Sequence, residues 1–239
     1  MALSSAFLQT QIGTALSSST VIRVFFRVTT SLSCFAIWPY VADVIDPHQI
    51  TLPFADPGLS VPDVLIHCTT ARAAKVWPFA YWKQVIDHAF ASGWSVGLVG
   101  SPPHAQREAY NAGDGEEWLL KQTSLIDMRG QTSLIQLAGA CKAARAVISV
   151  DAGPLHVAAA VGTPTLALVG NDIAAVGASP IRLWLPRCSN VSRTISSTTC
   201  HECESRRFRN NDCVVKGHPC MKSVEPTQVI AWLDSQIMD

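Results

Sequence analysis

The sequence predicts an α/β fold in which helices cover both faces of a parallel sheet, and three observations support this class. From Pro62 onward, short apolar runs alternate with segments of helical periodicity. The apolar runs contain few polar residues, which is typical of strands buried on both faces. Glycine and proline mark the junctions between the runs. These features together indicate a Rossmann-like domain.

Each element follows from its local pattern. The predicted strands are the apolar runs at residues 64–68, 94–99, 125–128 and 146–150, with another run after Pro164. The predicted helices are residues 79–90, 104–120, 133–144, 155–161 and 225–237. We expect the second helix to break at Gly113–Gly115, and Ser133 to cap the third. In the first helix, one face carries Trp82, Val85, Ile86 and Ala89.

Residues 1–60 form a region of different character. The first twenty residues are rich in serine and threonine and lack the basic start of a signal peptide. The apolar stretch from Val21 to Ile45 is interrupted by charges and a proline, so a spanning helix does not fit. We expect a helix or a pair of strands that packs on the domain, with a membrane-associated segment as the alternative. Residues 52–62 predict an extended linker.

Composition excludes several classes of protein. The chain has 239 residues, of which 48% are hydrophobic, so it can bury a substantial core. Eighteen basic and eighteen acidic residues cancel, and nothing in the overall charge favours nucleic acid as a partner. Four of the eight cysteines lie between residues 200 and 220, which favours a local site in a reducing compartment.

The stretch VISVDAGPLHVAAAVGTPTLALVG, residues 147–170, predicts a strand, a tight turn, a helix and a second strand. Small residues at the turn let an anion approach the backbone, and the N–H groups of the following helix favour negative charge. The candidate anion-binding residues are Asp151, Ala152, Gly153, Pro154, Leu155 and His156. For Asp151 a purely structural role, accepting backbone N–H bonds, is equally open. His156 is either a phosphate donor or a core histidine.

The loop after the first predicted strand reads HCTTARAAKVWP. It brings two threonine hydroxyls, Thr69 and Thr70, together with the cations Arg72 and Lys75. Facing the turn at residues 151–156 across the strand ends, this loop would complete a diphosphate site. The alternative is a solvated loop without a function.

These segments resemble glycosyltransferase family 9, the heptosyltransferases of the lipopolysaccharide core. The resemblance rests on HCTTARAAKVWPFAYW and QTSLIQLAGACKAARAVISVDAGPLHVAAAVGTPTLALVG, and it extends from about Val64 to the C-terminus. It implies the C-terminal half of a GT-B glycosyltransferase, with a nucleotide-sugar-binding domain over residues 61–239.

The resemblance also implies a set of roles. Thr69, Thr70 and Lys75 would contact the donor phosphates, and the backbone of residues 152–156 would hold the diphosphate. Gln106 or Glu108 would contact the ribose. The donor would be ADP-heptose, and its heptose would be transferred with inversion and without a metal to a lipopolysaccharide core or a protein acceptor, releasing ADP. The implied location is the cytoplasm, either free or at the periphery of the inner membrane.

The family's N-terminal domain and its catalytic aspartate have no recognisable counterpart in residues 1–60, so the general base is unassigned. We interpret this region as truncated or atypical. Three hypotheses about function remain. The chain is an enzyme completed by an oligomer or a separate acceptor-domain partner, or it is a non-catalytic donor-binding fragment or pseudoenzyme. The third hypothesis is a zinc-ribbon nucleic-acid module. The neutral charge argues against the last of these.

Residues 198–222 predict a cysteine-rich finger. Cys200, Cys203, Cys213 and Cys220 can surround a tetrahedral ion, and His201 or His218 could replace one thiolate. A structural Zn or Fe is the preferred interpretation, and four thiolates would leave no open position for catalysis. Reduced thiols or two disulfides are the alternatives. A local excess of Lys and Arg in this segment could bind an anionic lipopolysaccharide core or an acidic protein.

Overall fold

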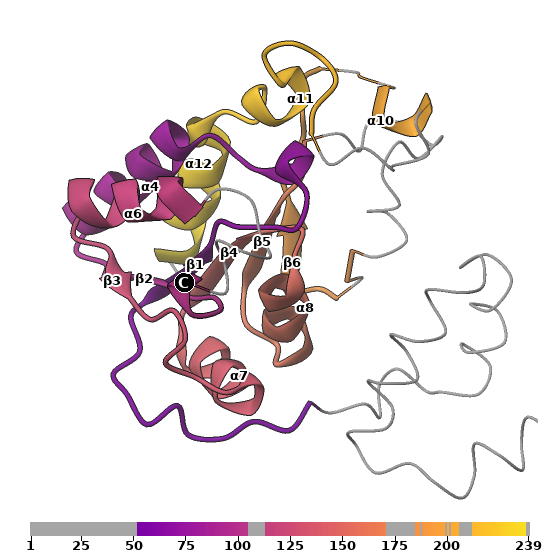
Figure 1. The fold of residues 1–239 in the computed structure, drawn as a ribbon. Coiled ribbons are helices and arrows are strands. Elements are labelled where there is room, and N and C mark those ends of the chain that lie inside the picture. The colour runs from indigo at the N-terminus through magenta and orange to yellow at the C-terminus, as the bar shows by residue number, and fades with distance from the viewer. Residues whose placement is uncertain are drawn as a thin grey trace, which may run out of the picture. The chain divides into compact units, whose positions relative to one another are not determined.

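Six parallel strands form one sheet between two layers of helices in the computed structural model (Figure 1). The structure describes residues 52–104, 113–170, 185–186, 188–198, 200, 202–205 and 212–237. The strands are β1 (Val64–His67), β2 (Val96–Leu98), β3 (Ile126–Asp127), β4 (Ala146–Val150), β5 (Thr165–Leu168) and β6 (Val191–Arg193). Their order is β3-β2-β1-β4-β5-β6, and every neighbouring pair is parallel. This is the strand order of a doubly wound Rossmann sheet, as the sequence predicts.

The helices alternate with the strands along the chain. They are α4 (Phe79–Ala91), α6 (Gly113–Gln122), α7 (Leu134–Ala143), α8 (Gly153–Ala160), α10 (Glu202–Ser205), α11 (Pro219–Lys222) and α12 (Pro226–Ile237), with the 3-10 turn η2 at Ala73–Lys75. Helices α4, α6 and α12 lie on one side of the sheet, and α7 and α8 lie on the other (Figure 1). No described helix combines the length and the apolar composition that crossing a membrane requires.

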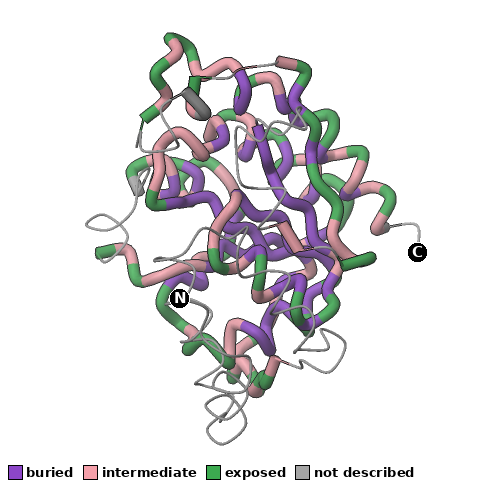
Figure 2. Tube along the Cα trace, turned by 90° about the vertical axis from the view of Figure 1, so that its right-hand side faces the viewer, coloured by how far each residue is buried: buried purple, intermediate pink, exposed green. Residues whose placement is uncertain are grey.

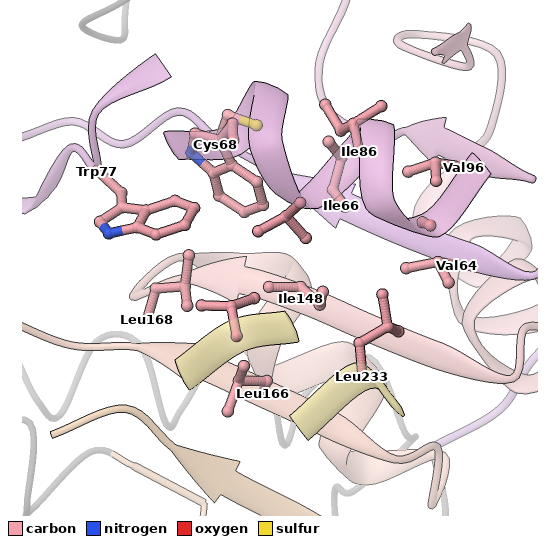
Figure 3. Close-up of a cluster of buried hydrophobic side chains, with 14 of the residues drawn as sticks. Val64, Ile66, Cys68, Trp77, Ile86, Val96, Ile148, Leu166, Leu168 and Leu233 are labelled. Atoms are coloured by element: carbon pink, nitrogen blue, oxygen red, sulfur yellow. The ribbon is translucent and has the colours of Figure 1, made fainter. Parts of the chain in front are cut away.

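Each face of the sheet has its own core. On the α4 and α12 side, Ile66 and Ile148 of adjacent strands share a cluster with Trp77 and Leu233 (Figure 3). On the α7 and α8 side, Leu65 and Val147 belong to a second cluster. Strand residues therefore alternate between two buried faces, and Figure 2 shows buried chain running through the centre of the molecule. This explains why the strands read as continuous apolar runs.

Local signals for α7 and α4 are confirmed. Ser133 is the N-cap of α7 and forms a capping box with Gln136, in which each side chain bonds the other residue's backbone N–H. Helix α4 buries the predicted face of Trp82, Val85, Ile86 and Ala89. Residues 52–62 contain no helix or strand, in agreement with the predicted linker.

Helix α6 begins at Gly113, so Gly113–Gly115 forms its first turn, and the predicted helical residues just before it lie outside the described residues. Gly115 is needed there because an added Cβ would collide with the ring of Phe79 on α4. The polar edge strand β6 was not anticipated, since Val191–Arg193 is short and largely exposed and so lacks an apolar pattern. The expectations for residues 1–51 and 105–112 lie outside the described residues.

Candidate functional site

The strand order places a topological switch point at the carboxyl ends of β1 and β4. These two strands are paired neighbours, and the chain continues from β1 toward β2 and β3 on one side and from β4 toward β5 and β6 on the other. Such a switch point is where open parallel sheets bind their ligands. The loop that follows β1 and the turn that follows β4 both start at this point. They are the two segments in which the sequence predicts phosphate contacts.

The structure joins these two segments through an ion pair. The ammonium of Lys75, at the end of η2, donates to Oδ2 of Asp151 over 2.5 Å. The Lys75 side chain keeps 30% of its surface exposed and the Asp151 side chain 16%. A solvent-accessible cation therefore stands at the switch point, and the predicted proximity of the two segments is confirmed.

The turn after β4 leads directly into α8. Ala152 is the N-cap residue of α8, and its methyl side chain cannot cap the helix. The Asp151 carboxylate next to it accepts its hydrogen bond from Lys75. Pro154 has no N–H, and the N–H of Leu155 already bonds to the carbonyl of Ala152 at 3.2 Å. The amide of Gly153 is therefore the group of this turn best placed to address an anion.

Two further observations describe the surface at this helix terminus. Apart from the adjoining residues and the backbone of α8, no atom lies within 4 Å of the position that a Cβ on Gly153 would take, so this backbone faces open space. The side chain of Leu155 instead packs into the core and contributes nothing to the surface. The groups of this turn that we still expect to contact a phosphate are therefore the backbone of Gly153 and the side chains around it.

His156 lies in the first turn of α8 and is exposed at its surface. Partial desolvation by neighbouring protein atoms lowers the pKa of its imidazole, while the charge of Asp151 raises it and that of Lys75 lowers it. These influences place His156 within electrostatic range of the ion pair. It is therefore a surface residue of the site, and the alternative of a core histidine does not hold.

The two threonines after β1 are both buried. Thr70 is 4% exposed, and its Oγ1 accepts a long bond of 3.5 Å from the N–H of Arg72. Thr69 is fully buried. His67 anchors the start of this loop because its Nδ1 bonds to the carbonyl of Val99 on the neighbouring segment at 2.8 Å. Burial lowers the pKa of His67, and its bonds to backbone carbonyls oppose that effect.

A buried charge cluster beside Thr69 was missed by the sequence analysis. Arg129 donates to Glu116 at 3.2 Å, to Glu117 at 2.9 Å and to both carboxylate oxygens of Asp127 at 2.8 Å. Burial raises the pKa of Glu116 to about 7, against the influence of Arg129. The Thr69 hydroxyl is near enough to lower that pKa, although it lies outside normal hydrogen-bond geometry.

One signal could have revealed this cluster. Glu116 lies three residues before Leu119 on the same buried face of α6, and a carboxylate at an apolar helical position calls for a buried partner. The predicted ribose contacts Gln106 and Glu108 fall outside the described residues. Among the described acids, Glu116 and Asp151 both lie close to the loop after β1, Glu116 beside Thr69 and Asp151 beside Lys75.

In the described part of the chain no disulfide joins the four cysteines of the predicted finger, so the disulfide alternative is not found. Burial, together with the charges of Cys200, Cys213 and Cys203, raises the pKa of Cys220 to about 11. The four sulfur atoms are thus near enough to influence one another. Among the described residues, no group of three or more potential ligands is arranged to hold a metal ion. A four-thiol set is nonetheless a donor set that Zn and Fe accept.

Comparison with known proteins connects this geometry to one family. Residues 3–206 match the family model of glycosyltransferase family 9 (heptosyltransferase). Lipopolysaccharide heptosyltransferase 1 of Pseudomonas aeruginosa is 34% identical over 116 residues, which cover 48% of this chain and 30% of the relative. Lipopolysaccharide heptosyltransferase 2 of Salmonella typhimurium is 26% identical over 208 residues, covering 85% of this chain and 55% of the relative.

Solved structures share the fold. The E. coli ADP-heptose lps heptosyltransferase II aligns with a TM-score of 0.54 and 22% identity, covering 75% of this chain and 48% of that one. The iron-containing dodecameric glycosyltransferase TibC from enterotoxigenic E. coli H10407 aligns with a TM-score of 0.58 and 16% identity, covering 80% and 50%. The neighbours support an α/β fold of the GT-B type. The chain spans about a third to about half of the length of these relatives. Because the family model matches most of its residues, the chain belongs to glycosyltransferase family 9.

Proposed function

We propose that this chain binds a nucleotide-diphosphate sugar at the switch point between β1 and β4 and serves a heptosyltransferase-type glycosyl transfer. The observation that carries the proposal is the Lys75–Asp151 pair beside the open backbone of Gly153. A cation and a helix N-terminus that converge on one accessible point form a site for a diphosphate. ADP-heptose is the proposed donor because a structural neighbour is described as an ADP-heptose enzyme.

The geometry suits the departing group of an inverting sugar transfer. As the bond between the sugar and the diphosphate breaks, negative charge grows on the diphosphate oxygens. The ammonium of Lys75 and the amide of Gly153 would stabilise that charge more strongly in the transition state than in the ground state. Asp151 neutralises the Lys75 ammonium in the free protein, and the donor diphosphate would compete with it for this cation. His156 could supply a further hydrogen bond from the first turn of α8.

The acceptor and its activation belong to the same proposal. A carboxylate general base must remove the proton of the acceptor hydroxyl, and none is assigned in the described residues. We propose a lipopolysaccharide core or a protein as the acceptor, since the curated relatives are lipopolysaccharide heptosyltransferases. A second copy of the chain or a separate acceptor-domain partner would complete the site if the chain alone does not. Such a protein would act in the cytoplasm, either free or at the inner-membrane surface.

The test is calorimetric titration of the purified chain with ADP, UDP and GDP, followed by sugar-release assays with the matching donor. Lys75→Ala should weaken ADP binding by about 1.5–3 kcal/mol, the contribution of a charge-assisted hydrogen bond. Lys83→Ala is the matched control, because Lys83 forms an equally short pair with Asp87 on the exposed face of α4. Equal affinities of the wild type and Lys75→Ala would refute the assignment. ADP binding without sugar release would favour a donor-binding fragment or pseudoenzyme.

The cysteine-rich finger is proposed to hold a structural metal. Cys200, Cys203, Cys213 and Cys220 would be the ligands, and the ion would order the segment without entering the reaction. Elemental analysis of the purified chain should find about one Zn or Fe per chain. Replacing Cys220 by Ser should reduce that content, whereas replacing Cys188, an exposed cysteine outside the four, should not.

A further inference from the structure

The loop that presents Lys75 has little support of its own. Its only regular element is η2, a single 3-10 turn in which no residue is buried. Within the loop, the N–H of Lys75 bonds to the carbonyl of Arg72 at 2.9 Å, and that of Val76 to the carbonyl of Ala73 at 3.0 Å. A turn of this length is too short to fix its own orientation.

Packing around this turn is incomplete. An open cavity of about 470 Å³ borders the loop, and it is lined by Ala73, Val76, Trp77, Pro78, Phe79, His218 and Lys222. Because the turn has space next to it, van der Waals contact leaves it room to shift. Hydrogen bonds to neighbouring segments therefore contribute to holding the turn that carries Lys75.

Two hydrogen bonds join this loop to the C-terminal segment around α11, which lies next to η2 (Figure 1). Nε2 of His218 is 2.8 Å from the carbonyl oxygen of Ala74, inside η2. Since a carbonyl only accepts, Nε2 is the ring nitrogen that carries the hydrogen. Nε1 of Trp77 donates in the opposite direction, to the carbonyl of Val224 at 2.9 Å. One bond thus holds the turn itself, and the other holds the chain just after it.

The backbone of His218 adopts a strained conformation. His218 is the one described non-glycine residue with a positive φ, at 51°, and it follows Gly217 at 88°. A residue with a side chain is strained in the left-handed region, and such strain persists where the surroundings require it. His218 precedes α11 yet makes no side-chain cap bond to that helix. Its ring is instead directed to Ala74.

We infer that His218 is a positioning residue for the donor site: by bonding the Ala74 carbonyl it fixes η2 and thereby holds Lys75 at the strand ends opposite Asp151. His218 does not touch the donor in this proposal and acts only through Lys75. The effect of His218 on donor binding rests on the function proposed above, whereas its effect on the position of η2 is independent of that function.

The test compares His218→Asn with His218→Gln. Asparagine tolerates the left-handed backbone, but its amide is too short to reach Ala74 as the imidazole does, whereas glutamine is long enough to donate the same bond. His218→Asn should weaken ADP binding about five- to tenfold, the worth of one hydrogen bond. His218→Gln should restore most of that loss. His88→Asn is the matched control, because His88 bonds to Asp234 between α4 and α12, at a distance from the site.

A double-mutant cycle separates positioning from general stabilisation. If His218 acts through Lys75, adding His218→Asn to Lys75→Ala should cause no further loss of ADP affinity. Equal losses in both backgrounds, or an unchanged affinity of His218→Asn in the wild-type background, would overturn the inference.

Hydrogen exchange provides a readout that needs no nucleotide. In His218→Asn the amides of Lys75 and Val76 should exchange about five- to tenfold faster, while those of α4 keep their rates. Unchanged exchange in this turn would also refute the positioning role. If the wild type failed to bind ADP but the turn loosened as expected, the proposed function would be wrong and the positioning of Lys75 by His218 would stand.

Discussion

The ammonium of Lys75 and the carboxylate of Asp151 lie 2.5 Å apart although 76 residues separate them in the sequence. The pair joins the loop after β1 to the turn after β4, at the one place where the winding of the sheet reverses. Before a donor binds, the cation is already neutralised. A diphosphate must therefore compete with Asp151 for Lys75.

This competition leads to a prediction for Asp151→Asn. Removing the carboxylate charge while keeping the side-chain shape should make Lys75 more available and tighten ADP binding about three- to tenfold. Titration calorimetry at constant ionic strength measures the change. Asp87→Asn, at the exposed pair with Lys83, should have no effect. Weaker ADP binding in Asp151→Asn would instead mean that Asp151 positions Lys75 for the phosphate.

Gly153→Ala tests whether the anion approaches the start of α8. Apart from the adjoining residues and the backbone of α8, the added methyl group meets no protein atom within 4 Å, so the melting temperature should remain within about 1 °C of the wild type. ADP affinity should nevertheless fall about tenfold, because the methyl group would stand where a phosphate contacts the amide. Unchanged affinity together with an unchanged melting temperature would show that the phosphate binds elsewhere.

Gly139→Ala on α7 should, in contrast, reduce the stability of the protein. A Cβ at Gly139 would collide with the carbonyl oxygen of Ala55, which belongs to the backbone and cannot rotate away. We expect a loss of about 1–3 kcal/mol in the free energy of unfolding. Urea denaturation followed by circular dichroism measures it, with Gly153→Ala as the matched glycine-to-alanine control. Full stability of the variant would mean that residues 52–57 can move away from α7 at no cost.

Glu116→Gln should change how stability depends on pH. Burial raises the pKa of Glu116 to about 7 from its ordinary value of 4.5, so between these values the folded state holds a proton that the unfolded state has released. The free energy of unfolding therefore falls as the pH rises through this window, by on the order of 3 kcal/mol from this residue. The neutral glutamine lacks this contribution.

The measurement is a series of urea titrations of both proteins from pH 5 to pH 8. The groups that interact with Glu116 are Arg129, Thr69, Asp127 and Cys68, and all of them remain in the variant. The stability of Glu116→Gln relative to the wild type should thus increase with pH. Parallel curves for the two proteins would contradict the raised pKa.

Much of the fold could be predicted because each element is encoded locally. The apolar runs that became β1 and β4, the capping box of Ser133 and the buried face of α4 are short-range patterns, and the structure contains all three. The segments of the candidate site were predictable for the same reason. Polar and small residues directly follow apolar strands, and parallel strands bring their carboxyl ends to one edge.

The sequence by itself therefore determined the α/β class, the alternation of strands and helices, and the two loops that meet at the strand ends. Only the tertiary structure decided which side chains meet. It paired Lys75 with Asp151, buried Thr69 beside Glu116 and Arg129, and brought His218 to Ala74 across 144 residues. Contacts between distant residues depend on strand order and helix packing, and these are set by burial of the whole core, which no local pattern encodes.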